Sequence, residues 1–188
     1  MKIFERKRNK KEGLYDPTKE HDSCGLGFIA NIKGVKSHDI IEKGIYILEN
    51  LEHRGATGAD PLVGDGAGML TQIPHDLYLK EMEKLNVMLP SSGSYGVGMF
   101  FFPRDLKHNA LIKKLIKNLS EEQGISLLGW RDVPVNNDCL SKDKEIRESE
   151  PKHVQGFFKK PVGINEQDFE RSLYVLRKKT TNRIRIER

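Results

Sequence analysis

Cys24 is the side chain in this sequence that is best placed for chemistry, because it lies where a polar leader meets the first apolar run. The stretch "EHDSCGLGFIA", residues 20–30, puts the thiol directly before Gly25. If residues 1–23 were removed, Cys24 would carry a thiol and a free α-amine together. An α-amine has a pKa of about 7.7 to 8.0, so it is partly neutral at pH 7 and can take the proton of the thiol. This pattern indicates a cysteine nucleophile with its own base, and a plain core cysteine is the alternative.

The elements that would position this cysteine are predicted from hydrophobic spacing and glycine. Residues 26–30 are apolar and glycine-spaced, which is typical of a buried strand. A helix is expected next, capped at its start by Ser37 and stopped by a left-handed Gly55. A tight glycine-rich loop then leads to a short strand over residues 69–74.

In the rest of the chain, helices and strands are mixed without the regular alternation of a Rossmann domain. The run from Val97 to Phe102 is apolar at nearly every position, which predicts a strand buried on both faces. Asn165 and Asp168 form a capping box, which predicts the start of the last helix. The other expected elements are helices over residues 75–87 and 105–123, a strand over 125–131, and at most a short strand over 156–163.

Length and charge limit the possible functions. The 188 residues suffice for one domain with a sizeable core. The formal net charge is +5 at pH 7, but much of the excess lies at the two ends of the chain. No recognition module for nucleic acid accompanies it, so nucleic-acid binding is not expected.

Cysteine and hydropathy patterns limit the compartment and the cofactors. The two cysteines, Cys24 and Cys139, make no disulfide framework, which fits a reducing cytoplasm. No apolar run reaches the roughly 18 residues that a membrane span needs, and the basic leader lacks the apolar core of a secretory signal. His21, Asp22 and Cys24 are too tightly bunched for a metal site, so no metal is expected.

Four stretches closely resemble one family, in order and with the expected spacing, over about residues 13–178. They are "GLYDPTKEHDSCGLGFIANI", "LENLEHRGATGADPLVGDGAGML", "SYGVGMFFFP" and "ERSLYVLRK". The family is the class II glutamine amidotransferase domain that begins the large subunit of glutamate synthase, an N-terminal-nucleophile hydrolase. The pair formed by "EHDSCG" and "LEHRGATGADP…GDGAG" is far more specific than a lone glycine motif.

The resemblance assigns roles to particular residues. Residues 1–23 match a propeptide, and residues 24–188 match the N-terminal part of the amidotransferase domain. Cys24 matches the nucleophile that attacks the side-chain amide of L-glutamine, giving a γ-glutamyl thioester and ammonia. Arg54 and Gly55, in "EHRG", match the substrate pocket beside the nucleophile, and a surface arginine is the other interpretation of Arg54. The family uses no histidine as base here, so His53 is not expected to act as one.

The resemblance also implies a fold and partners. The fold class is α+β, a four-layer α/β/β/α sandwich that would be incomplete at the C-terminal side. The family's oxyanion donors match positions beyond Arg188, so this chain is expected to be a partial copy with little activity alone. FMN, an iron–sulfur cluster and NADPH would belong to the rest of the enzyme, which makes glutamate from 2-oxoglutarate, and to a small NADPH-oxidising subunit.

Two other functions stay open from the sequence. The chain could be a non-catalytic fragment that assembles with a separately encoded remainder of the enzyme. It could also be an amidotransferase of amino-sugar or purine synthesis. Those relatives usually begin almost directly at the cysteine and lack the "GATGADP…GDGAG" stretch, which disfavours this function.

Overall fold

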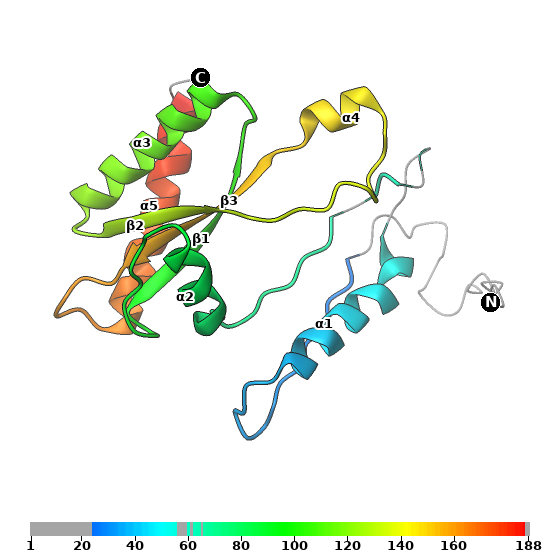
Figure 1. Cartoon of the computed structure of the whole chain (residues 1–188), viewed down its shortest axis with the longest axis horizontal. Helices are drawn as coiled ribbons and strands as arrows, with labels where there is room; N and C mark the ends of the chain where they lie inside the picture. The colour runs from blue at the N-terminus through cyan, green and yellow to red at the C-terminus, as the bar shows by residue number, and fades with distance from the viewer. Residues whose placement is uncertain (1–23, 56–59, 61, 65, 187–188) are drawn as a thin grey trace, which may run out of the picture. The chain divides into compact units, whose positions relative to one another are not determined.

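The computed structural model describes residues 24–55, 60, 62–64 and 66–186 (Figure 1). The chain divides into two compact units between Thr71 and Gln72. The expected leader, residues 1–23, lies outside the described residues. Each unit is described by itself below.

The N-terminal unit contains helix α1, His38–Asn50, and the short 3₁₀ helix η2, Glu52–Arg54. Ser37 caps α1 as predicted, since its side-chain oxygen accepts a 3.2 Å hydrogen bond from the Asp39 backbone N–H. The prediction that Gly55 stops this helix in the left-handed region is wrong. The helix already ends at Asn50, where the chain tightens into the 3₁₀ turn, and Gly55 is extended with φ −89° and ψ 149°.

The predictions of two strands within residues 24–74 are also wrong. Neither residues 26–30 nor residues 69–74 form a strand in the described part of the chain. Leu26 and Phe28 are 90% and 88% exposed, so the run is not buried either. An apolar run becomes a strand only when a neighbouring strand pairs with its backbone groups, and none of the described residues pairs with this one.

The C-terminal unit is built on an antiparallel sheet of three strands in the order β1-β3-β2. The strands are β1, Tyr95–Phe102, β2, Ser126–Asp132, and β3, Lys152–Lys159. Strand β3 is eight residues long and central, whereas the sequence predicted at most a short strand there. Its first half, Lys152–Gln155, is polar apart from Val154 and therefore resembles a loop when read alone.

Four helices complete this unit, and local signals position their ends. Asp105 caps α3 by accepting a 2.7 Å hydrogen bond from the His108 N–H, and Gly124 follows the helix with φ +69°. The predicted box before α5 is confirmed, because Asn165 Oδ1 accepts from the Asp168 N–H at 2.9 Å. The helices are α2, His75–Glu83, α3, Leu106–Glu122, α4, Lys144–Ser149, and α5, Glu166–Ile186.

Helix α2 ends earlier than residue 87, where the sequence placed its end. Asn86 has φ 56°, in the left-handed region, and the Val87 N–H bonds back to the Met82 carbonyl at 2.9 Å. This turn ends the helix because it satisfies a carbonyl of the last helical turn without a further residue of helix.

The hydrophobic core of this unit lies on both faces of the sheet. Phe157 and Phe158 are neighbours on β3 and therefore point to opposite faces. Phe158 belongs to the cluster under α3 and α5, and Phe157 to the cluster under α2. The second face is covered only in part, since Phe101 is 64% exposed. The run from Val97 to Phe102 in β1 was predicted to be buried on both faces. That prediction is wrong at Phe101.

The described residues give an α+β fold with one antiparallel sheet. A second sheet, which the four-layer sandwich needs, does not occur among them. No described helix is both long enough and apolar enough to cross a membrane.

Candidate active site

The predicted nucleophile lies at the start of an extended segment that packs against α1. Cys24 is exposed and is not in a disulfide. Gly25 lies against the Leu51 side chain, and Gly27 lies against the Ile47 side chain. The segment therefore runs antiparallel to the helix and brings Cys24 to the end where α1 stops.

Arg54 is held at that same end of α1. The Leu51 N–H bonds to the Ile47 carbonyl at 3.1 Å, and the Arg54 N–H bonds to the Leu51 carbonyl at 2.8 Å. Leu51 thus contacts the cysteine segment and also begins the turn that carries Arg54. Arg54 is half-buried, while Gly55 beside it is exposed. The fold of this unit therefore gathers the three predicted site residues, Cys24, Arg54 and Gly55, at one end of one helix.

His53 has a local partner in the same turn. Its Nδ1 lies 2.8 Å from the Asn50 carbonyl oxygen, so this ring nitrogen donates to a backbone acceptor. The contact caps the end of α1.

The other residues considered for chemistry lie elsewhere. His21 and Asp22 are outside the described residues. Cys139 is exposed in the C-terminal unit, with its thiol 3.5 Å from the Asn136 carbonyl oxygen. Among the described residues, no group of three or more histidine, cysteine, aspartate or glutamate side chains could hold a metal ion.

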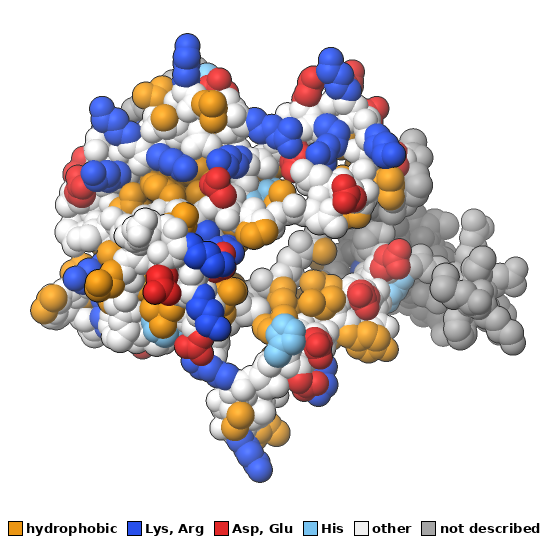
Figure 2. All heavy atoms as spheres, in the orientation of Figure 1, with side chains coloured by type: hydrophobic (Ala, Val, Ile, Leu, Met, Phe, Trp, Pro, Cys, Tyr) orange, Lys and Arg blue, Asp and Glu red, His pale blue; other side chains and the backbone are white. Residues whose placement is uncertain are grey.

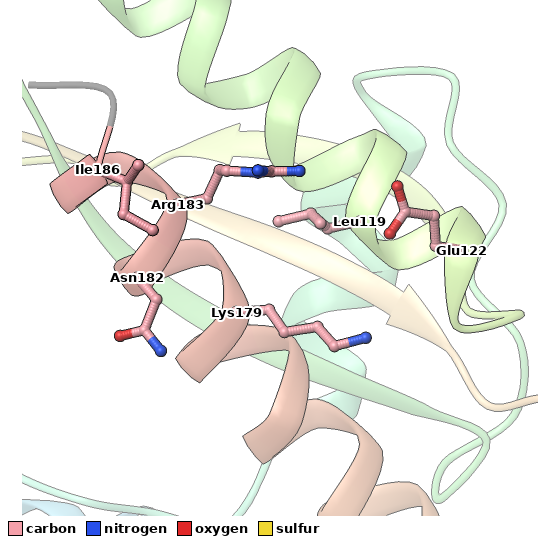
Figure 3. A pocket seen from close by; sticks show the side chains of 6 residues that line it. All are labelled: Leu119, Glu122, Lys179, Asn182, Arg183 and Ile186. Carbon is pink, nitrogen blue, oxygen red and sulfur yellow. The ribbon is translucent and has the colours of Figure 1, made fainter.

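A depression between the ends of α3 and α5 contains none of the predicted site residues. Its charged side chains are of both signs, Glu122 on α3 and Lys179 and Arg183 on α5 (Figure 3). Its lining includes no thiol, histidine or convergent pair of carboxylates. The six lining residues are Leu119, Glu122, Lys179, Asn182, Arg183 and Ile186.

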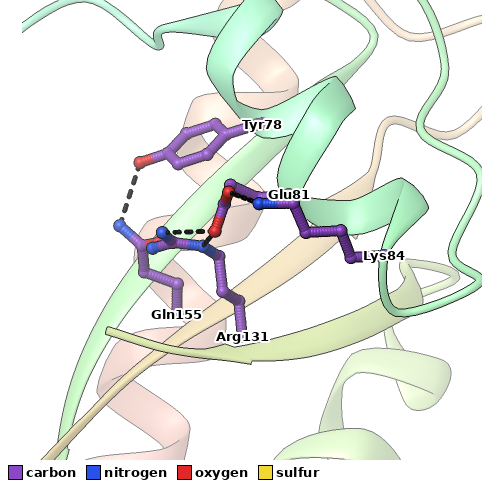
Figure 4. Close-up of polar contacts among 5 residues, drawn as sticks. All are labelled: Tyr78, Glu81, Lys84, Arg131 and Gln155. Atoms are coloured by element: carbon purple, nitrogen blue, oxygen red, sulfur yellow. Dashed lines mark hydrogen bonds and ion pairs between the residues drawn. The ribbon is translucent and has the colours of Figure 1, made fainter. Parts of the chain in front are cut away.

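A polar network that the sequence did not indicate fixes α2 to the sheet (Figure 4). Arg131 on β2 donates to Glu81 Oε2 at 3.0 and 3.3 Å and to Gln155 Oε1 at 3.0 Å. Gln155 in turn donates to the Tyr78 hydroxyl at 2.9 Å, with 7% of the glutamine exposed. Hydrogen bonds from Lys84 and then Arg131 lower the pKa of Glu81. Each of these donors has an acceptor within the network, which indicates a structural role.

The sequence signal for this network was too weak to find in advance. Its members come from α2, β2 and β3, and Glu81 and Arg131 are 50 residues apart. Only the pairing of β2 with β3, which places Arg131 opposite Gln155, brings them together.

Comparison with known proteins agrees with the resemblance of the motifs. The family model of class-II glutamine amidotransferases matches residues 24–188. The chain is 42% identical over 178 residues to the NADPH glutamate synthase large chain of Bacillus subtilis, covering 92% of this chain and 11% of that protein. It is 41% identical over 185 residues to the NADH glutamate synthase of Saccharomyces cerevisiae, covering 94% and 9%.

A plant relative shows the same pattern. The chain is 37% identical over 165 residues to the chloroplastic ferredoxin-dependent glutamate synthase 2 of Arabidopsis thaliana, covering 88% of this chain and 10% of that protein. The chain thus spans about a tenth of the length of these relatives. On the match over residues 24–188, the chain belongs to the class-II glutamine amidotransferase family.

Proposed function

We propose that this chain supplies the glutaminase step of a glutamate synthase, with Cys24 as nucleophile. The observation that carries the proposal is that the segment beginning at Cys24 and the turn that carries Arg54 both meet Leu51 at the end of α1. The family match begins at Cys24, which agrees with a mature chain that starts there. The relatives named above are glutamate synthases, which supports this reaction over those of amino-sugar or purine synthesis.

The chemistry requires the thiol and the α-amine that removal of residues 1–23 would expose. The α-amine of Cys24 takes the thiol proton, and the thiolate attacks the side-chain carbonyl carbon of glutamine. The tetrahedral intermediate collapses with cleavage of the C–N bond, and the α-amine returns the proton so that ammonia leaves. Water then attacks the γ-glutamyl thioester, which releases glutamate and restores the thiol.

Arg54 stabilises the charged species in this scheme. Its guanidinium keeps its positive charge at neutral pH and favours the thiolate form of a nearby cysteine. The planar set of five N–H donors also orders the pocket for the substrate. Gly55, which follows without a side chain, leaves room for the substrate beside the arginine.

The rest of the enzyme supplies the other functions. The named relatives use NADPH, NADH or ferredoxin, yet each matches this segment, so the segment does not choose the electron donor. FMN, the iron–sulfur cluster, NADPH and the small NADPH-oxidising subunit belong to other parts of the synthase. In those other parts of the synthase, the ammonia reacts with 2-oxoglutarate. The proposed location of the enzyme is the cytoplasm.

The complete domain would be the four-layer α/β/β/α sandwich. The partly open second face of the described sheet supports this proposal, because Met99 and Phe101 are 50% and 64% exposed. A second sheet packed on that face would bury both side chains.

The test uses a hybrid in which this chain replaces the matching 178-residue segment of the Bacillus subtilis large chain. The hybrid should release ammonia from glutamine, and its intact mass should show Cys24 as the first residue. Cys24→Ala should abolish the release, while Cys139→Ala, the matched control, should not. Ammonia release by the Cys24→Ala hybrid would overturn the assignment.

Arg54→Lys in the same hybrid tests the second site residue. Lysine keeps the charge but loses the planar donor set, so ammonia release should fall clearly without a change in thermal unfolding. Unchanged activity would mean that Arg54 is a surface charge.

An assembly role is the second candidate, and one observation favours it. The N-terminal unit exposes large apolar side chains, among them Leu26, Phe28 and Ile32. Figure 2 shows hydrophobic side chains in orange on the surface of the described residues. Such side chains commonly mark contact surfaces. Under this candidate the chain pairs with a separately encoded remainder of the enzyme and catalyses nothing alone. Mixing it with such a remainder should give co-elution, and separate elution would rule the candidate out.

A further inference from the structure

The segment that begins at Cys24 has a glycine face and a side-chain face. Gly25 and Gly27 face α1, while Leu26 and Phe28 between and after them are 90% and 88% exposed. Alternation with a period of two is what an extended chain produces. The two glycine positions therefore lie against the helix, and the side chains of Leu26 and Phe28 do not.

The spacing along the segment matches the spacing along the helix. Two extended residues advance by about 6.4 to 6.8 Å. Four helical residues, the step from Ile47 to Leu51, advance by about 6 Å. Gly25 therefore meets Leu51 at the end of α1 and Gly27 meets Ile47 one turn earlier, and Cys24 is the next residue back along the segment.

The two glycines differ in how tightly they fit. A Cβ at position 25 would lie 2.8 Å from Leu51 Cδ2, the far end of a side chain that can rotate. A Cβ at position 27 would come under 3.0 Å from Ile47 Cγ2, a separation that real Cβ atoms essentially never show. Ile47 is β-branched and helical, so its χ1 has one strongly preferred value and the methyl cannot move aside.

We propose that Gly27 is a positioning residue for Cys24. Its missing side chain lets the segment lie directly on Ile47, and this contact sets the place of Cys24 beside the turn that carries Arg54. A methyl at position 27 would displace the segment by about 1 Å to restore an ordinary carbon–carbon contact. This inference rests on the proposed role of Cys24 as nucleophile.

The first test measures geometry in this chain and needs no catalysis. In a chain carrying Arg54→Cys and Cys139→Ser, Cys24 should form a disulfide with the new thiol on mild oxidation. Disulfides form only when the two Cα atoms lie roughly 4.4 to 6.8 Å apart, so the rate reports small displacements. Gly27→Ala should slow the reaction, and Ile47→Leu, which deletes the γ2 methyl at similar volume, should restore it.

Two controls separate this effect from a general response to alanine. Gly68→Ala adds a methyl where nothing lies within 4 Å and should leave the rate unchanged. Gly25→Ala should have a smaller effect than Gly27→Ala, because Leu51 can rotate. Equal rates in all variants, failure of Ile47→Leu to rescue, or no disulfide in the parent chain would each overturn the proposal.

The second test measures catalysis in the hybrid. A nucleophile misplaced by 1 Å can cost about 100-fold in rate, so Gly27→Ala should lower kcat by about that factor with KM little changed. Adding Ile47→Leu should recover most of the loss. If the parent hybrid releases no ammonia while the disulfide pattern holds, the proposed function fails and the positioning role stands. If the hybrid is active and the disulfide pattern is absent, the positioning role fails alone.

Discussion

The two units of the chain differ in what they bury. Every buried hydrophobic side chain among the described residues lies in the C-terminal unit, on one face of the sheet or the other. Helix α1 of the N-terminal unit has no buried residue, and its Tyr46 is 65% exposed. The candidate nucleophile nevertheless lies in the N-terminal unit. Stability and proposed chemistry are therefore placed in different parts of this chain.

Substitutions in the two units should therefore affect different properties of the chain. Changes under the sheet should alter the unfolding of the C-terminal unit, and changes around α1 should alter local opening or activity. Regions with few buried contacts open with low free energy, which is common for segments that bind and react.

The largest effect is expected for Phe157→Ala. Phe157 is 0% exposed and packs edge-on against Tyr78, with ring centroids 5.1 Å apart. Loss of such a ring should lower the free energy of unfolding by about 3 to 5 kcal/mol, measured by urea denaturation. Phe101→Ala is the control, because this ring on the same sheet face is 64% exposed and should cost much less. Equal losses of unfolding free energy in the two variants would show that burial on that face does not decide the contribution of each ring.

A smaller loss is expected for Arg131→Ala. The arginine side chain is 11% exposed, and its removal leaves Glu81 and the buried Gln155 without their shared donor. Hydrogen bonds to charged groups contribute about 1.5 to 3 kcal/mol, and a loss of that size is expected in urea denaturation. Arg171→Ala, at an exposed pair with Asp168, should change stability by less than about 1 kcal/mol. A neutral Arg131→Ala would show that the network does not hold α2.

Ser37→Ala should weaken α1 without weakening the sheet. Loss of an N-cap side chain costs about 0.5 to 2 kcal/mol of helix stability. Faster hydrogen exchange should appear in the amides of His38–Asn50 and not in β3. Ser37→Asp, which keeps an acceptor, should restore the parent rates. Faster exchange in both units would contradict the separation described above.

The smallest expected effect is a loss of stability of the C-terminal unit at acid pH. Because the folded-state pKa of Glu81 is lowered from 4.5, its contribution is present above pH 4.5 and is lost as the pH falls through the folded value. Stability of the C-terminal unit should therefore decline at acid pH, and Glu81→Gln should flatten this decline. Measurement of the unfolding midpoint between pH 3 and 6 tests it. If the unfolding midpoint of Glu81→Gln falls with pH as steeply as that of the parent chain, other carboxylates cause the loss of stability at acid pH.

Local features of the fold could be predicted from the sequence. Ser37, Asp105 and the Asn165–Asp168 pair cap their helices through contacts within three residues, and Gly124 ends a helix through its own backbone. Such signals need no knowledge of the rest of the molecule. Helix ends were therefore predictable wherever the side chain of a neighbour decides them.

Strands and site contacts were harder because distant residues decide them. Residues 26–30 look like a strand but have no paired neighbour in the described chain, whereas β3 looks irregular and is paired on both sides. The residue types at Cys24 and Arg54 were evident from the motifs. The contact of Gly27 with Ile47 was not, since it depends on how the segment lies on the helix.

The strand order has a consequence for synthesis on the ribosome. Strands β1 and β2 both pair with β3 and not with each other, yet β3 is made last. At about 5 to 20 residues per second, the apolar β1 waits roughly 3 to 11 s for its partner to be polymerised, plus the time for β3 to leave the exit tunnel. During that interval Phe100, Phe101 and Phe102 have no sheet to enter. We therefore expect the nascent chain to bind chaperones that recognise exposed aromatic runs until β3, Lys152–Lys159, has left the exit tunnel.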